Sequence, residues 1–192
     1  MQSFKSTLRA IVWLPIALVL LGCEPALDFL PRLLGQDVPD EPQTPRAPVQ
    51  SPAIAKDEAE VRQRINEIRQ ERGLNQLRDN ERLAQVARNY SQKMARKNFF
   101  SHTSPDGDTS AQRVRSAGIF YLVMGENLFK STNFPKPVPL AVKGWMDSPG
   151  HRENILHPEY TQTGVGIWRE GNTYYITQLF MRSEFSPRDL FR

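Results

Sequence analysis

The sequence predicts a domain of the α+β class, in which helices come first along the chain and strands come last. Apolar residues recur every three or four positions between about residues 57 and 98, which is the period of helices packed on one face. Two stretches rich in β-branched and aromatic residues, 164–168 and 173–180, surround a Gly-Asn turn and predict a β-hairpin. Strands and helices do not alternate, so a parallel sheet is not expected.

Residues 1–22 have the pattern of a signal peptide. Lys5 and Arg9 give a basic start, and an apolar run from Ala10 to Leu21 follows. This apolar run is too short to predict a membrane-spanning helix. We therefore expect export from the cytoplasm and removal of this segment.

Cys23 directly follows the signal peptide. The preceding Leu-Leu-Gly resembles a bacterial lipobox, and this resemblance implies that Cys23 becomes the lipidated first residue of the mature protein. The alternative is an ordinary signal peptide with an incidental cysteine. Residues 23–54 are rich in proline and predict an extended tether. We expect a protein of the bacterial cell envelope, periplasmic or at the cell surface, whose partner is the membrane through its lipidated N-terminus.

The first two helices of the predicted domain follow this tether. Asp57 and Glu60 resemble a capping box, so the first helix is expected to begin at Asp57 and to end at Gly73. A second helix is predicted over residues 80–98, with an apolar stripe at helical spacing.

Shorter elements are predicted in the middle of the chain. A helix over residues 110–117 is expected, followed by a loop over 131–139 that holds three prolines, and by a helix over 140–146. Ser148 and the proline after it are typical of a helix start, which would place His151 in the first turn of a further helix. The domain is expected to span 55–183, with a polar tail over 184–192.

Charge and cysteine content exclude several classes of function. The formal charge of +4 falls to about +2 when Lys5 and Arg9 are removed with the signal peptide, and no block of basic residues is present. Nucleic acid is therefore not an expected partner. Cys23 is the only cysteine, so the domain cannot depend on disulfide bonds.

Three separate stretches each place a histidine or a glutamate among residues that shape the backbone. The first contains His102 in Phe-Ser-His-Thr-Ser-Pro-Asp-Gly, the second is Gly-Glu-Asn around Glu126, and the third is Ser-Pro-Gly-His-Arg, which contains Ser148 and His151. We expect His102, Glu126 and His151 to converge in one cleft, with Ser148 as a further candidate ligand-binding residue.

Two imidazoles and a carboxylate can hold a divalent cation such as Zn²⁺ and leave one position open for water or ligand. Two other interpretations remain open for His102, Glu126 and His151. They form a hydrogen-bonded cluster that only stabilises the domain, or they form a catalytic site in which Glu126 acts as base on a metal-bound water. Ser148 is a candidate nucleophile, although a helix cap explains it equally well.

Several motifs in order resemble the bacterial branch of the CAP superfamily, which includes cysteine-rich secretory proteins, antigen 5 and plant pathogenesis-related proteins. They are the His102 motif, Gly-Glu-Asn, Trp-Met-x-Ser-Pro-Gly-His-Arg-x-Asn-Ile-Leu, Tyr-Thr-x-x-Gly-Val-Gly and Thr-Gln-x-Phe, and they cover residues 57–182. The resemblance implies a three-layer α-β-α sandwich with a small central antiparallel sheet. The hairpin would lie in the middle of that sheet, with a third strand over 125–130.

The resemblance also implies a cleft with two histidines and two glutamates. His102, Glu126 and His151 match three of these positions, and Ser148 stands where the second glutamate is expected. The predicted function is a membrane-anchored binding module whose cleft takes a divalent metal, a small ligand or an envelope component. The alternatives are a cell-envelope hydrolase that uses the same cleft and a structural or adhesive lipoprotein, so enzymatic activity is left open.

Overall fold

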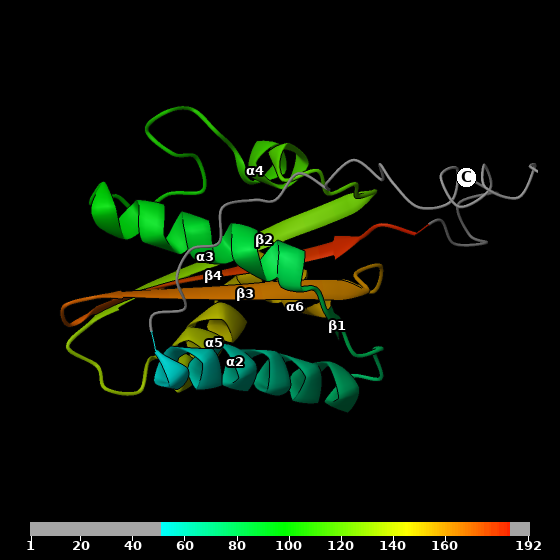
Figure 1. Ribbon diagram of the computed structural model, residues 1–192. Helices are drawn as coiled ribbons and strands as arrows, with labels where there is room; N and C mark the ends of the chain where they lie inside the picture. The colour runs from blue at the N-terminus through cyan, green and yellow to red at the C-terminus, as the bar shows by residue number, and fades with distance from the viewer. Residues whose placement is uncertain (1–50, 185–192) are drawn as a thin grey trace, which may run out of the picture. The chain divides into compact units, whose positions relative to one another are not determined.

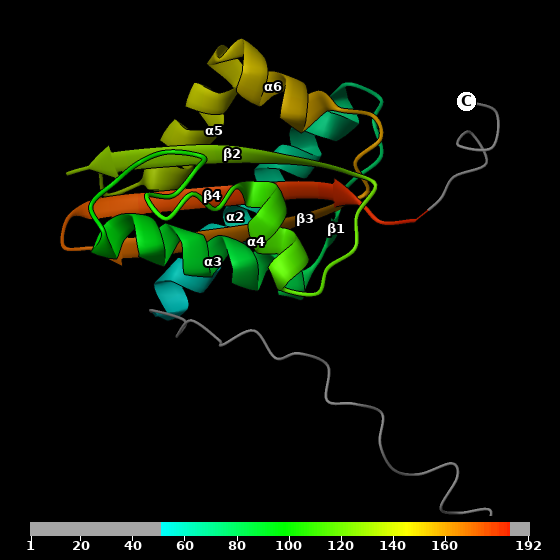
Figure 2. The ribbon, with the colours of Figure 1, turned by 90° about the horizontal axis from the view of Figure 1, so that it is seen from above.

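A four-stranded sheet lies between two layers of helices in the computed structural model, which describes residues 51–184 (Figure 1). The elements in chain order are α2 (Pro52–Glu71), β1 (Arg78–Asp79), α3 (Glu81–Arg96), α4 (Ser110–Ser116), β2 (Val123–Thr132), α5 (Pro137–Asp147), α6 (Pro149–Leu156), β3 (Gln162–Glu170) and β4 (Thr173–Arg182). Helices α3 and α4 cover one face, and α2, α5 and α6 cover the other (Figures 1 and 2). The predicted α+β sandwich is thereby confirmed.

The sheet has the strand order β1-β3-β4-β2. The β3–β4 hairpin turns at Gly171 and Asn172 and forms the centre of the sheet, as predicted. Strand β2 pairs antiparallel with β4, from Val123 opposite Arg182 to Thr132 opposite Thr173. The two-residue strand β1, which pairs parallel with β3, was not predicted.

Alternate residues of the central strands bury their side chains on opposite faces of the sheet. Ile176 and Phe180 of β4 pack in the core formed with α2, α5 and α6, whereas Leu179 and Met181 pack with α3 and α4. This alternation follows from the two-residue period of a β-strand. A strand with apolar residues on both faces is therefore buried between two helical layers.

Helix α3 lies directly against the backbone of β3 because two glycines leave room for it. A Cβ atom at Gly166 would overlap the backbone of Ala87 and Arg88, and one at Gly164 would overlap the backbone of Leu83 and Ala84. The hydroxyl of Ser91 on α3 donates to the carbonyl oxygen of Gly166 at 2.9 Å.

Side chains from the helices satisfy backbone groups along the edges of the sheet. On β3, the backbone N–H of Ile167 donates to the buried carboxylate of Glu58 at 3.0 Å. On β2, the carbonyl oxygen of Leu128 accepts from the indole N–H of Trp145 at 2.9 Å. Covered edges do not pair with a second chain.

The buried guanidinium of Arg69 fixes the segment that follows α6. It donates to the carbonyl oxygens of Asn75, Ile155, His157 and Tyr160 at 2.8 to 3.3 Å. Arg69 is 0% exposed, and burial lowers its pKa. Because these carbonyls are held from within the core, the orientation of α6 is set at the end opposite His151.

The predicted start of the first helix was wrong. Helix α2 begins at Pro52, and the Ser51 hydroxyl accepts from the backbone N–H of Ile54 at 3.3 Å, so Asp57 lies inside the helix. Serine followed by proline is itself a strong start signal, which the Asp57 pattern obscured. Residues 52–54, which we placed in the tether, are helical.

In the middle of the chain, the predicted bounds of the loop over 131–139 and of the helix over 140–146 were also wrong. Strand β2 runs to Thr132 and α5 begins at Pro137, so the predicted loop over 131–139 shrinks to residues 133–136. Pro137 fits the first turn of a helix, where no backbone N–H is needed. Ser148 does occupy the N-cap position of α6, but its side chain makes no capping hydrogen bond.

The predictions for the signal peptide, for Cys23 and for most of the tail fall outside residues 51–184. Within those residues, none of the helices combines the length and the hydropathy that a membrane-spanning segment requires.

Candidate functional site

The loop between α3 and α4 carries His102, and side chains from both helices fix its backbone. The hydroxyl of Tyr90 donates to the carbonyl oxygen of Ser101 at 2.6 Å. The guanidinium of Arg113 donates to the carbonyl oxygens of His102 at 3.2 Å and Asp108 at 2.9 Å. Burial raises the pKa of Tyr90 to about 12, so its hydroxyl stays a donor at neutral pH. The exposed side chain of His102 therefore extends from a backbone that these hydrogen bonds hold in place.

Glu126 lies on β2 with a side chain only 3% exposed, and both of its carboxylate oxygens are engaged. Oε1 lies 2.8 Å from Nδ1 of His102, and Oε2 accepts from Arg113 at 2.7 Å. Because an ionised carboxylate only accepts, Nδ1 of His102 carries the proton of this bond. In the neutral ring, Nε2 is then the nitrogen with a free lone pair.

The positive guanidinium of Arg113 pairs with the buried negative carboxylate of Glu126. Its side chain is 9% exposed, and its guanidinium lies over the ring of Tyr90 at 3.2 Å from the centroid. A buried carboxylate is costly unless it is paired and hydrogen-bonded. The chain His102–Glu126–Arg113–Tyr90 therefore links the solvent-exposed imidazole to the core.

His151 lies in the first turn of α6, half-buried, with its ring centroid 6.5 Å from that of His102. Burial lowers the pKa of His151, and the nearby His102 lowers it further. Both effects favour the neutral imidazole, which is the form that binds metal ions.

The Gly-Glu-Asn motif joins β2 to α6. A Cβ atom at Gly125 would overlap the hydroxyl of Tyr160 and come within 2.6 Å of Oδ1 of Asn154, so glycine permits close packing here. The amide of Asn127 donates to the carbonyl oxygen of His151 at 3.1 Å, and that of Asn154 donates to Oδ1 of Asn127 at 2.9 Å. These bonds hold the first turn of α6 beside Glu126.

The structure brings His102 and Glu126 into contact and places His151 beside them. Both carboxylate oxygens of Glu126 accept hydrogen bonds within the protein, one from His102 and one from Arg113. Among residues 51–184, no three His, Cys, Asp or Glu side chains form a group that could hold a metal ion. Ser148 stands three residues before His151, half-buried and without a capping bond.

Arg113 and Tyr90 were not predicted from the sequence as residues of the site. Tyr90 was interpreted only as part of an apolar stripe, and its ring does pack in the core. Arg113 lies two positions from Arg115 on the same short helix, and nothing in the spacing distinguishes the buried arginine from the exposed one. Only the folded loop shows which of the two reaches Glu126.

Comparison with known protein families identifies the family of this chain. Residues 62–180 match the model of the cysteine-rich secretory protein (CAP) family. The chain belongs to the CAP family. Two curated relatives come from Bacillus subtilis strain 168: "Uncharacterized protein YkwD", 41% identical over 124 residues, and "Uncharacterized membrane protein YlbC", 34% identical over 125 residues. Each alignment covers 65% of this chain but only 46% and 34% of the relative, so the chain matches less than half of either protein.

Solved structures with the same CAP fold include bacterial proteins. An extracellular protein containing an SCP domain from Bacillus anthracis strain Ames is 28% identical, with a TM-score of 0.62 over 71% of this chain and 45% of that one. An outer surface protein from Borrelia burgdorferi is 23% identical, with a TM-score of 0.62 over 67% of this chain and 94% of that one. The shared fold thus covers nearly all of the solved Borrelia chain.

Proposed function

We propose that this CAP protein is an extracytoplasmic, lipid-anchored binding module that holds a divalent cation such as Zn²⁺ between His102 and His151. One observation carries the proposal. The Glu126 carboxylate binds Nδ1 of His102 at 2.8 Å and leaves Nε2 free, beside a second imidazole whose pKa is lowered. A carboxylate that orients a histidine in this way is the usual partner of a metal-binding imidazole.

The two rings lie close enough to share an ion after a small movement. A Zn–N bond of about 2.1 Å, added to the radius of each ring, puts two ligating ring centroids roughly 5.3 Å apart at the tetrahedral angle that zinc prefers. The observed distance is 6.5 Å, and His102, with a side chain 58% exposed, has room to adjust. Two protein ligands leave the remaining positions for water or for a ligand from the envelope.

In this proposal Glu126 orients a metal ligand, whereas its residue type alone predicts that it coordinates the metal itself. Arg113 and His102 occupy its two oxygens, so it orients His102 and does not coordinate the ion. This arrangement favours binding over covalent catalysis. Within the described part of the chain, no hydroxyl or thiol is hydrogen-bonded to either imidazole, as an activated nucleophile would be.

Two observations support the extracytoplasmic location. The residues before Cys23 resemble a lipobox, and one structural relative is described as extracellular. A Cys23→Ser substitution in the full-length gene should move the protein from the membrane fraction to the soluble fraction. A variant that stays in the membrane fraction would contradict the anchor.

Zinc titration of the purified protein tests the cation site. Added zinc should raise the melting temperature, since a ligand at about 100 times its Kd adds about 2.7 kcal/mol to the free energy of unfolding. His102→Ala and His151→Ala should abolish this rise, and Glu126→Gln should reduce it. His157→Ala is the matched control, because His157 lies at the C-terminal end of α6, opposite to His151, and its ring stacks on Tyr160 at 4.5 Å.

The control decides between a specific site and general zinc binding by histidines. The proposal fails if zinc does not change the melting temperature of the wild type. It also fails if the rise survives in His102→Ala and His151→Ala to the same extent as in His157→Ala.

A further inference from the structure

A stretch of the chain without acidic residues carries exposed apolar side chains. Residues 127–146 contain no Asp or Glu, and their three lysines are Lys130, Lys136 and Lys143. Within this stretch Phe134 is 53% exposed and Leu140 is 38% exposed. An exposed aromatic side chain beside lysines is the combination found on surfaces that bind at the interface of an anionic membrane.

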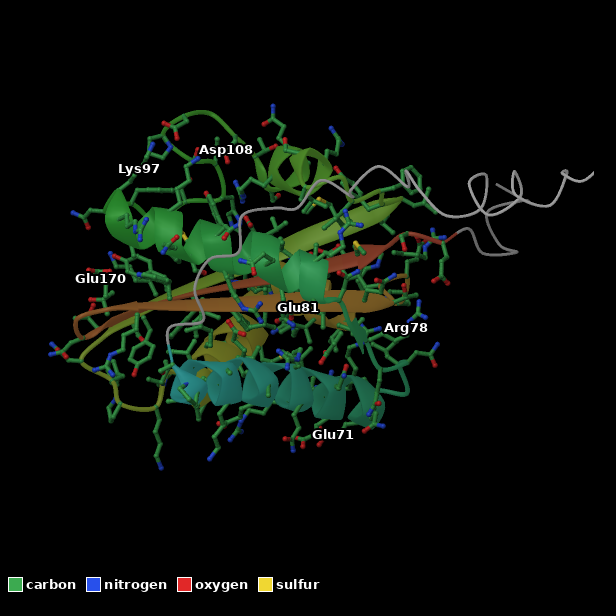
Figure 3. All side chains as sticks on the ribbon, viewed as in Figure 1. Glu71, Arg78, Glu81, Lys97, Asp108 and Glu170 are labelled. Carbon is green, nitrogen blue, oxygen red and sulfur yellow. The ribbon has the colours of Figure 1, made fainter. Side chains whose placement is uncertain are left out.

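The loop that carries Phe134 lies at the end of the domain where the chain enters it. The backbone N–H of Asn133 donates to the carbonyl oxygen of Asn172 in the β3–β4 turn at 2.9 Å. Both views place this turn, the end of β2, the end of α3 and the start of α2 at the same end of the domain (Figures 1 and 2). Figure 3 shows Lys97 and Glu170 at this end, and Glu71 and Arg78 at the opposite one.

A shallow hollow of about 230 Å³ opens beside Phe134. It is lined by Asn133, Phe134, Pro135, Arg169, Asn172 and Tyr174. The guanidinium of Arg169 lies 5.2 Å from the centroid of the Tyr174 ring. Guanidinium and amide groups suit phosphate oxygens, and an aromatic ring beside them suits the interface between headgroups and acyl chains.

Two acidic residues at this end have partners inside the protein. Glu170 accepts from the indole N–H of Trp168 at 3.1 Å, and Asp106 pairs with Lys97 at 2.7 Å. Lys130 and Lys136 are both exposed. The Lys130 ammonium lies 4.9 Å from the centroid of the Tyr175 ring.

We propose that this end, formed by residues 130–136 and the β3–β4 turn, docks on the surface of an anionic bilayer. The inference rests on the proposed anchor at Cys23. Residues 24–50 connect that cysteine to Ser51 and can span at most about 100 Å even when fully extended. A domain held so close to the bilayer needs only weak contacts to stay docked, because tethering raises its local concentration.

Vesicle co-sedimentation of residues 41–192 tests the proposal without the anchor. The domain is expected to bind vesicles that contain about 30% phosphatidylglycerol in phosphatidylcholine and to leave phosphatidylcholine vesicles unbound. The double substitution Lys130→Gln/Lys136→Gln should lower the partition coefficient at least tenfold, since each basic residue near such a surface contributes about fivefold. Phe134→Ala should lower it severalfold.

Matched controls lie at the far end of the domain. Phe120, 64% exposed, precedes the start of β2, and Arg72 and Arg78 are exposed beyond the end of α2. Phe120→Ala and Arg72→Gln/Arg78→Gln should leave the partition coefficient within twofold of the wild type. Equal binding to both kinds of vesicle, or an equal loss in the control variants, would overturn the proposal. Because the domain lacks Cys23, neither result depends on whether that residue is lipidated.

Discussion

Arg113→Met keeps most of the length of the side chain but removes the cation that pairs with Glu126. The two side chains are 9% and 3% exposed, so solvent screens their interaction little. After the substitution, the carboxylate remains buried with only the His102 ring beside it. We therefore predict that Arg113→Met causes a large loss of stability, although Arg113 belongs to none of the sequence motifs.

The magnitude follows from the geometry. Removing one partner of a buried ion pair costs about 3–5 kcal/mol. Arg113 also donates to two loop carbonyls, each bond contributing about 0.5–1.5 kcal/mol, but bonds that share one side chain do not add fully. A loss of about 4 kcal/mol is therefore expected, a large part of the 5–15 kcal/mol typical of a domain.

Urea unfolding followed by circular dichroism measures this loss. Arg115→Met is the matched control, because Arg115 is exposed on the same helix, and it should cost less than about 1 kcal/mol. Adding Glu126→Gln to Arg113→Met should recover part of the loss, since it removes the unpaired charge. An Arg113→Met protein within 1 kcal/mol of the wild type would refute the reasoning, as would a double variant that is no more stable than the single one.

Three further predictions concern the same framework. Tyr90→Phe leaves the carbonyl oxygen of Ser101 without its donor and should cost about 1 kcal/mol in urea unfolding, with a severalfold weaker zinc affinity by titration calorimetry. Gly125→Ala should cost about 1–3 kcal/mol, because the ends of two side chains can shift, whereas Gly166→Ala should cost more, because its Cβ would meet the backbone of α3. The pKa of His151 lies below its ordinary value of 6.5, so the unfolded chain takes up this proton more readily. The free energy of unfolding should therefore be greatest above pH 6.5 and fall as the pH drops through 6.5 toward the lowered value, and His151→Asn should reduce this slope in urea unfolding across that range.

The β3–β4 hairpin and most helices could be predicted because their residues have the composition or the spacing typical of the element. The hairpin around Gly171 and Asn172 is one example, since its turn residues separate two stretches rich in β-branched and aromatic residues. Helix starts were harder to predict. Ser51 and Asp57 both have residue types that cap helices, and local sequence does not show which of the two the fold uses.

The candidate site was predictable where its residues stand in motifs. His102, Glu126 and His151 each lie in such a stretch, and the structure places them together. Their roles were not predictable, because the role of Glu126 depends on Arg113, a residue on another element. The neighbours of a carboxylate decide whether it coordinates a metal or orients a ligand, and those neighbours are set by tertiary packing.

A crystal structure of the protein grown with zinc, with anomalous data collected at the zinc edge, tests the central claim most directly. We predict a single strong anomalous peak about 2.1 Å from Nε2 of His102 and equally close to a ring nitrogen of His151. Both oxygens of Glu126 should stay bonded to His102 and Arg113, more than about 3 Å from the ion. An ion coordinated by the Glu126 carboxylate, or no peak between the two rings at saturating zinc, would contradict the account.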